Sequence, residues 1–293
     1  MTEPEVSRKY SLEFSELRGA EPPERRASSR PEVPDMIHRK SAAEIAIMTE
    51  GGRMVARILK RMKEVVKPGI TTMDIADEAD SMARDLGVVP AFKGYNGYPA
   101  VICVSVNEEV VHGIPSRSRV LKEGDIVGLD FGALHDGFYA DAAVTLPVGE
   151  TAQETDRLLD VTRSALFRGI DAALVGNRIG DISHAVQSHV ESNGFSVVKV
   201  FVGHGIGRNL HEEPQIPNYG ESQWGVRLKK GMTLAIEPMV NAGSDSVHVL
   251  EDGWTAVTSD GSLSAHFEHT IAVTDNGPEI LTLGPTLGEE NGS

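Results

Sequence analysis

The sequence predicts an α+β protein in which two similar halves share an antiparallel sheet, with helices covering one face of that sheet. Two observations predict this architecture. Two helical patterns are followed by short strand patterns as far as Leu146, and the same order then recurs at a constant spacing of 107 residues.

The first helix is predicted by a capping signal at residue 41. Ser41 is followed three positions later by Glu44, and apolar residues then recur every three or four positions. The helix should end at Lys67-Pro68-Gly69, because proline and glycine stop helices. A second helix is predicted from a cap at residues 71–74 to about Leu86-Gly87.

Strand patterns follow at 101–106, 126–131 and 137–146, and the last two predict a hairpin. Asp136-Gly137 is a strong two-residue hairpin turn, so Asp141 should face Gly132. Asp130 lies two residues from Gly132 on the same face, which puts the β-carbons of Asp130 and Asp141 roughly 7 Å apart.

The repeat is defined by landmarks that all lie 107 residues apart. They are Asp74 and Asp181 early in a helix, Gly87 and Gly194 at a helix end, Leu121 and Leu228 before a turn, and Asp130 and Glu237 six residues after a glycine. A site on the axis between the halves would draw one acid from each.

Three regions are expected along the chain. Residues 1–39 form an arm rich in proline and charge, with too few apolar residues for a core, and should be poorly ordered. Residues 40–284 should form the catalytic domain that contains the repeat, and residues 285–293 a flexible tail.

Charge and composition exclude several classes of protein. The formal net charge of −15 argues against direct nucleic-acid binding and against a polybasic membrane-surface protein. The single cysteine, Cys103, closes no intramolecular disulfide. With no long apolar run and an acidic N-terminus, the chain is expected to be cytoplasmic, with no membrane partner.

Metal chemistry is indicated by a few residues whose individual signals are ambiguous. Asp130 and Asp141 would repel each other unless cations lie between them, although a solvated sheet face would also tolerate them. His204 stands among Gly203, Gly205 and Gly207, which would clear space for a metal or substrate, although a lone histidine is often structural.

Two further acids complete the set. Glu237 ends an apolar strand and Glu268 precedes one, and each is open to reading as an ordinary edge acid. Taken together, four carboxylates and one imidazole match the charge of two divalent cations and suit manganese, iron, cobalt or zinc. Two such ions can hold a bridging hydroxide and polarise a carbonyl, so the set predicts a dinuclear metallohydrolase.

At these residues the chain resembles a type I methionine aminopeptidase, over residues 40–283. The matching motifs are Gly94-Tyr95-Asn96-Gly97-Tyr98-Pro99, Val111-His112-Gly113-Ile114-Pro115, the hairpin 130–141, Gly203-His204-Gly205-Ile206-Gly207, His211-Glu212-Glu213-Pro214, Ile236-Glu237-Pro238 and Phe267-Glu268-His269-Thr270. The resemblance implies the pseudo-two-fold pita-bread fold, a monomer, and removal of the initiator methionine from nascent proteins whose second residue is small.

The resemblance also implies a role for each site residue. Asp130 would chelate one ion, His204 and Glu237 the other, and Asp141 and Glu268 would bridge them. The two ions would be cobalt, manganese, iron, zinc or nickel.

Proton transfer and substrate contacts are implied in the same way. Glu237 would take a proton from the bridging water, His112 would contact the scissile amide nitrogen, and His211 would bond the carbonyl oxygen. The methionine pocket would be lined by Tyr95, Tyr98, Cys103 and Trp254.

Two departures and two alternatives stay open. Leu210 and Phe92 differ from residues of some relatives and would alter the shape of the methionine pocket. The resemblance implies that the partners would be nascent polypeptide N-termini, and it leaves transient ribosome association open. A proline-specific hydrolase of the same fold and a non-catalytic binding protein are the alternative functions.

Overall fold

The two N-terminal helices begin at their predicted caps. The computed structural model describes residues 37–284, and its first helix, α2 (Ala42–Val65), follows Ser41, whose hydroxyl accepts from the Glu44 N–H. The Glu44 carboxylate accepts in return from the Ser41 N–H, so the capping box is confirmed. The next helix, α3 (Thr72–Leu86), has the same kind of cap and ends at Gly87, which is left-handed at φ 70°.

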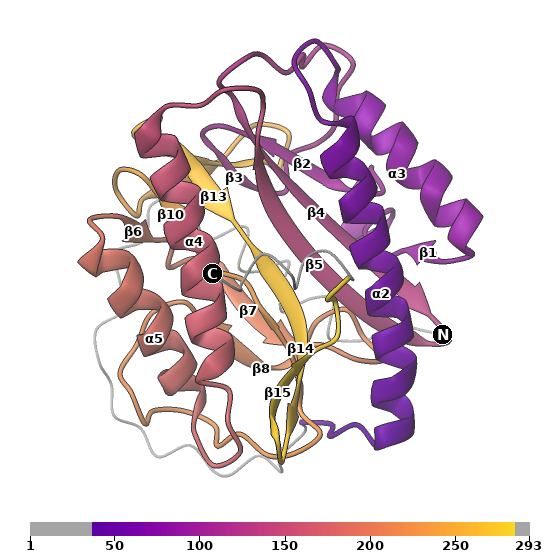
Figure 1. Cartoon of the computed structure of the whole chain (residues 1–293), viewed down its shortest axis with the longest axis vertical. Coiled ribbons are helices and arrows are strands. Elements are labelled where there is room, and N and C mark those ends of the chain that lie inside the picture. The colour runs from indigo at the N-terminus through magenta and orange to yellow at the C-terminus, as the bar shows by residue number, and fades with distance from the viewer. Residues whose placement is uncertain (1–36, 285–293) are drawn as a thin grey trace. The chain divides into compact units, whose positions relative to one another are not determined.

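The second half repeats this pattern with α4 (Gln153–Asp171) and α5 (Ile179–Ser192). The Asp181 carboxylate accepts from the backbone N–H of Arg178 at the start of α5. In the same way, the Asp74 carboxylate accepts from the backbone N–H of Thr71 at the start of α3. Isolated β-bridges join residues 71 and 120 in one half and residues 178 and 227 in the other, again 107 positions apart. Figure 1 shows the four helices on the same side of the sheet.

The main sheet has nine strands in the order β1-β4-β5-β14-β9-β7-β8, with β2 also on β4 and β15 also on β14. All of its pairings are antiparallel. Its strands are β1 (Val89–Pro90), β2 (Cys103–Val106), β4 (Ile126–His135), β5 (Phe138–Pro147), β7 (Val202–Gly205), β8 (Glu212–Pro217), β9 (Thr233–Ile236), β14 (Glu268–Thr274) and β15 (Gly277–Ile280).

Two small sheets lie outside the single sheet that the sequence predicted. One has the order β13-β10-β6 and the other β11-β12-β3. Their strands are β3 (Glu109–Val111), β6 (Ser196–Val197), β10 (Met239–Asn241), β11 (Val247–Val249), β12 (Ala256–Thr258) and β13 (Ser264–His266). These two- and three-residue strands are too short to give a clear alternating pattern.

The β4–β5 hairpin has the predicted register. Asp136 and Gly137 form the turn with φ of 46° and 79°, and Gly132 pairs with Asp141. A turn with both central residues at positive φ matches the right-handed twist of the strands. The hairpin therefore puts Asp130 and Asp141 on the same face, as expected.

Each half has an apolar core between its helices and the sheet. One core joins α2 and α3 to β2, β4 and β5, with Ile58, Ile75 and Leu129 fully buried. The other joins α4 and α5 to β9 and β14. Leu129 and Phe131 of β4 face the helices, so Asp130 between them lies on the opposite face, together with Asp141 and Glu268 by the strand register.

Parts of the predicted organisation fall outside the described residues. Of the arm predicted over residues 1–39, only 37–39 are described, and the tail over 285–293 is outside the described range. Within residues 37–284, no helix combines the length and the apolar character that a membrane crossing requires.

Candidate metal centre and active site

The main sheet brings together the five residues predicted as metal ligands. Asp130 and Asp141 lie on β4 and β5, and Glu268 is the first residue of β14. Ala143 of β5 pairs with Asp130 on one side and with Glu268 on the other, so these two acids lie level across three strands. His204 comes from β7, and its neighbour across the sheet, β9, ends one residue before Glu237.

Their side chains approach one another closely. One ligand atom from each of Asp141, His204 and Glu268 lies within 4.8 Å of the other two, and all three residues are buried. The Nε2 atom of His204 lies 3.5 Å from Oε1 of Glu237. Asp130 lies beside Asp141 on the same face of the β4–β5 hairpin, because Gly132 pairs with Asp141. The sheet thus concentrates four acidic groups around one imidazole.

The four carboxyl groups are costly to ionise together. Burial raises the pKa of Asp141 to about 7 and the pKa of Asp130, Glu237 and Glu268 well above their usual range, and Asp141 raises those three further by repulsion. Among residues 37–284, Oδ1 of Asp130, Oδ1 of Asp141 and Oε1 of Glu268 are buried without a hydrogen-bond partner. Buried acceptors without donors and without counter-charge fit divalent cations.

His204 has the tautomer that a metal ligand needs. Its Nδ1 lies 2.9 Å from the carbonyl oxygen of Gly205, and a carbonyl can only accept, so Nδ1 carries the proton. Nε2 then presents its lone pair toward the acids. Burial lowers the pKa of this ring to about 4, which keeps it neutral at pH 7.

The glycines beside His204 are required for close packing, which differs from the expectation. A Cβ at Gly203 would lie 2.5 Å from the carbonyl oxygen of Ala235, and one at Gly205 would lie 2.2 Å from that of Glu213. A Cβ at Gly207 would collide with the side chain of Lys40. The glycines therefore permit close packing of strands and of one lysine, and the expectation that they clear space for a metal was wrong.

Two further histidines border the cluster. The Nδ1 atom of His211 is 2.8 Å from the hydroxyl of Tyr95, and its ring centroid is 4.2 Å from that of His204. His112 has a positive φ of 61°, and its buried Nδ1 has no hydrogen-bond partner among the described residues. Burial lowers the pKa of both rings, that of His112 to about 4. A strained, buried and neutral histidine is typical of a functional site.

The four residues predicted to line the substrate pocket belong to one apolar cluster. Tyr95, Tyr98, Cys103 and Trp254 pack in it together with Phe92 and Leu210. Tyr98 meets Trp254 edge to face at 5.1 Å and donates its hydroxyl to the carbonyls of Ile102 and Gly113. Burial raises the pKa of the Cys103 thiol well above its usual value, so it is a neutral, soft surface.

One residue of the site was not predicted. His266 is buried, and its Nε2 lies 3.8 Å from Oε2 of Glu237. The signal was present in the sequence, because His266 and Glu268 are two positions apart and flank Phe267. Side chains two apart along extended backbone share a face, so this spacing marks the histidine as a candidate to face the acids.

The chain belongs to the metallopeptidase family M24, whose family model matches residues 46–275. It is therefore a metallopeptidase, a hydrolase whose family uses divalent metal ions, and the buried acids described above fit such ions. Within this family its similarities are specific. It is 53% identical to methionine aminopeptidase 1 of Bacillus subtilis over 247 residues, which cover 84% of this chain and 99% of the relative.

Solved structures agree with this result. The structure of methionine aminopeptidase from Thermotoga maritima has a TM-score of 0.83 and 55% identity, and the match covers 84% of this chain and 99% of that one. The prolidase of Pyrococcus furiosus has a TM-score of 0.69 at 22% identity, over 85% of this chain and 66% of that one, which shows a shared fold alone. The α+β pita-bread fold expected from the motifs is confirmed.

Proposed function

We propose that this chain is a methionine aminopeptidase that removes the initiator methionine from nascent proteins whose second residue is small. The observation that carries the proposal is the buried cluster of four acids and one imidazole, bordered by His112 and His211 and by an apolar cluster. The names of the relatives in Bacillus subtilis and Thermotoga maritima support the same activity.

The acids and His204 would hold two divalent ions. Asp130 would chelate one ion, His204 and Glu237 the other, and Asp141 and Glu268 would lie between them. Two divalent cations balance four carboxylates, and the mixed oxygen and nitrogen donors suit cobalt, manganese, iron, zinc or nickel. When bound, such ions polarise a carbonyl and acidify water.

Glu237 is proposed to take the proton from the attacking water. Its carboxylate is buried beside the other acids and next to the place where the ions would bind, so it can accept the proton of an activated water. The proton can then pass to the leaving amine. His266, close to Oε2 of Glu237, is neutral because burial lowers its pKa to about 3.

The two histidines would orient the scissile amide. If the Tyr95 hydroxyl donates to Nδ1 of His211, the proton of that ring lies on Nε2, which can donate to the carbonyl oxygen of the substrate. Such a donor stabilises the charge that develops on this oxygen. His112 is proposed to contact the amide nitrogen, and its Nδ1 has no hydrogen-bond partner among residues 37–284.

The methionine side chain would enter the cluster of Tyr95, Tyr98, Cys103 and Trp254. Aromatic faces and a neutral thiol make favourable contacts with a thioether. Phe92 and Leu210 pack in the same cluster, so they set the shape of this pocket.

The biological setting is proposed on the same basis. The substrates are the N-termini of nascent polypeptides, which places the reaction in the cytoplasm, with transient ribosome association and without direct binding of nucleic acid or membrane. The enzyme is proposed to act as a monomer, with residues 40–284 as its catalytic domain.

The test is peptidase activity after chelation and readdition of manganese, iron, cobalt, zinc or nickel. Metal-dependent cleavage of Met-Ala-Ser but not of Met-Leu-Ser is the expected result, because only a small second residue should fit. Cleavage of Ala-Pro peptides instead would favour a proline-specific hydrolase. Failure to cleave any peptide with any ion, in folded protein, would favour a binding protein.

A further inference from the structure

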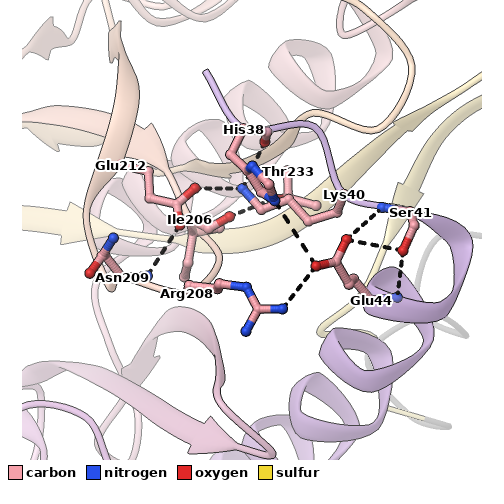
Figure 2. A network of polar contacts seen from close by, with 9 residues as sticks. All are labelled: His38, Lys40, Ser41, Glu44, Ile206, Arg208, Asn209, Glu212 and Thr233. Carbon is pink, nitrogen blue, oxygen red and sulfur yellow. Dashed lines mark hydrogen bonds and ion pairs between the residues drawn. The ribbon is translucent and has the colours of Figure 1, made fainter. Parts of the chain in front are cut away.

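A buried lysine contacts Glu212, the residue that follows His211 in the chain. The side chain of Lys40 is only 2% exposed, and its Nζ donates to Oε2 of Glu212 at 2.5 Å and to the carbonyl oxygen of His38 at 3.0 Å. Its backbone N–H donates to the carbonyl of Gly231 at 2.6 Å. Figure 2 shows this lysine at the centre of a polar network. Lysines are almost never buried unless they are paired, so this one has a specific use.

The partner of Lys40 belongs to the turn that carries His211. We call residues 206–212 the His211 turn and residues 38–44 the anchor segment. Glu212 accepts from Lys40 through Oε2, and its Oε1 accepts from the backbone N–H of Asn209 at 3.1 Å. The Glu212 carboxylate thus links the end of the His211 turn to Asn209 in its middle and to Lys40 in the anchor segment.

The anchor segment holds the turn at a second point. Arg208 donates to Oε1 of Glu44 at 3.0 Å, and Glu44 is itself fixed by the capping box at the start of α2. Figure 2 shows these contacts on either side of Lys40. The first turn of a long helix is a rigid support, so the His211 turn has two tethers to a fixed element.

The packing at Gly207 shows that space is reserved for Lys40. A Cβ at this position would lie 2.2 Å from Cε of Lys40 and 2.6 Å from its Nζ. The lysine side chain therefore passes through the space that a side chain at residue 207 would occupy. A Cβ at residue 207 would force the end of the lysine side chain to shift.

We infer that Lys40 is a positioning residue, which acts through Glu212 to fix the orientation of His211. Glu212 is the next residue after His211, so a displacement of the Glu212 carboxylate moves the backbone that carries the imidazole. Stability alone explains such a pair poorly, because the cost of desolvating two charges offsets most of their attraction. The inference rests on the proposed function only for the role of His211 in catalysis.

The kinetic test is Lys40→Met, which keeps the length of the side chain and removes its charge. We expect kcat for Met-Ala-Ser to fall about ten- to a hundredfold, because a small misplacement of a catalytic group is costly, while KM changes less than about twofold. The matched control is Lys199→Met, which breaks an exposed pair with Asp245 and should leave both constants unchanged. An unchanged kcat in Lys40→Met would overturn the inference.

A double-mutant cycle separates positioning from general stability. If Lys40 acts through His211, then Lys40→Met should cost nothing further in a His211→Ala background. Equal losses in the two backgrounds would show that the lysine acts elsewhere. If Lys40→Met unfolds, Glu212→Gln has the same shape and tests the same pair, with the same outcome expected.

A spectroscopic readout keeps the inference separate from the proposed function. In metal-free protein with 15N-labelled histidine, the Nδ1 signal of His211 reports its hydrogen bond with Tyr95. We expect this signal to shift in Lys40→Met and to stay unchanged in Lys199→Met. A wild-type protein without peptidase activity would refute the proposed function, whereas an unshifted signal in Lys40→Met would refute the positioning role.

Discussion

A histidine binds a metal only through a nitrogen that lacks a proton, and the carbonyl oxygen of Gly205 settles this for His204. It accepts from Nδ1 and leaves Nε2 to face the acids. His112 also depends on its local backbone, because its φ of 61° lies in the left-handed region that most residues avoid. At the scale of single residues, the chemistry therefore depends on the positions of backbone groups, which the sequence pattern did not predict.

Glu237→Gln tests the proposed proton transfer at a single atom. Glutamine has the same shape but cannot take a proton from water, so kcat should fall about a hundred- to ten-thousandfold. Unfolding curves and metal content should be recorded alongside kcat, with the exposed Glu251→Gln as the control. Activity close to that of the wild type would contradict the assigned role.

Glu109 predicts a pH dependence of stability away from the site. Burial raises its pKa above the ordinary value of 4.5, although its carboxylate accepts from the Val106 N–H. A raised folded-state pKa means that the contribution of Glu109 to stability is most favourable below pH 4.5 and is lost as the pH rises through the folded pKa. Glu109→Gln keeps an acceptor for Val106 and should therefore unfold at higher urea concentration at pH 7, with little difference at pH 3.5. A variant less stable than the wild type at pH 7 would refute this assignment.

At the scale of elements, the turn and cap residues explain how much the sequence predicted. Asp136-Gly137 fixes the register of β4 and β5 through its backbone angles alone, and the capping boxes fix the starts of α2 and α3, so these features were predictable. The contact of Lys40 with Glu212 joins residues 172 positions apart, and no local pattern encodes it. The short strands of the two small sheets likewise depend on tertiary packing.

The close packing at β7 can be tested with two glycines of the main sheet. Gly203→Ala would push a methyl group against the carbonyl of Ala235, so it should destabilise the fold by about 1–3 kcal/mol and disturb His204 next to it. Gly128→Ala, on β4, meets only ordinary contacts at 3.6 Å and is the matched control. Urea unfolding of both variants, with the metal content of each, measures the effect. Equal stability of the two variants would show that β7 relaxes freely.

At the scale of the whole molecule, the fold encloses more negative charge than it can balance with its own side chains. The five proposed ligands come from both halves of the repeat, and both halves pack their helices on the opposite face. Stability of the molecule is therefore linked to its ions.

Removal of metal should lower the melting temperature. An ion at about 100 times its Kd contributes about 2.7 kcal/mol of stability, so chelated protein should melt several degrees lower and recover when manganese is added.

Asp141→Asn removes one of the repelling charges. Without metal this variant should melt above the wild type, and with metal below it; the same order under both conditions would argue against a cation site.

The spread of the ligands along the chain has a consequence for its synthesis. In order of translation the proposed ligands are Asp130, Asp141, His204, Glu237 and Glu268, and the last belongs to the strand at the centre of the sheet. A growing chain that has passed Asp130 and Asp141 has two acids but neither the imidazole nor the closing carboxylate. Chains that lack the later ligands would thus compete poorly for scarce metal, and a new molecule would gain both ions only after Glu268 had been added.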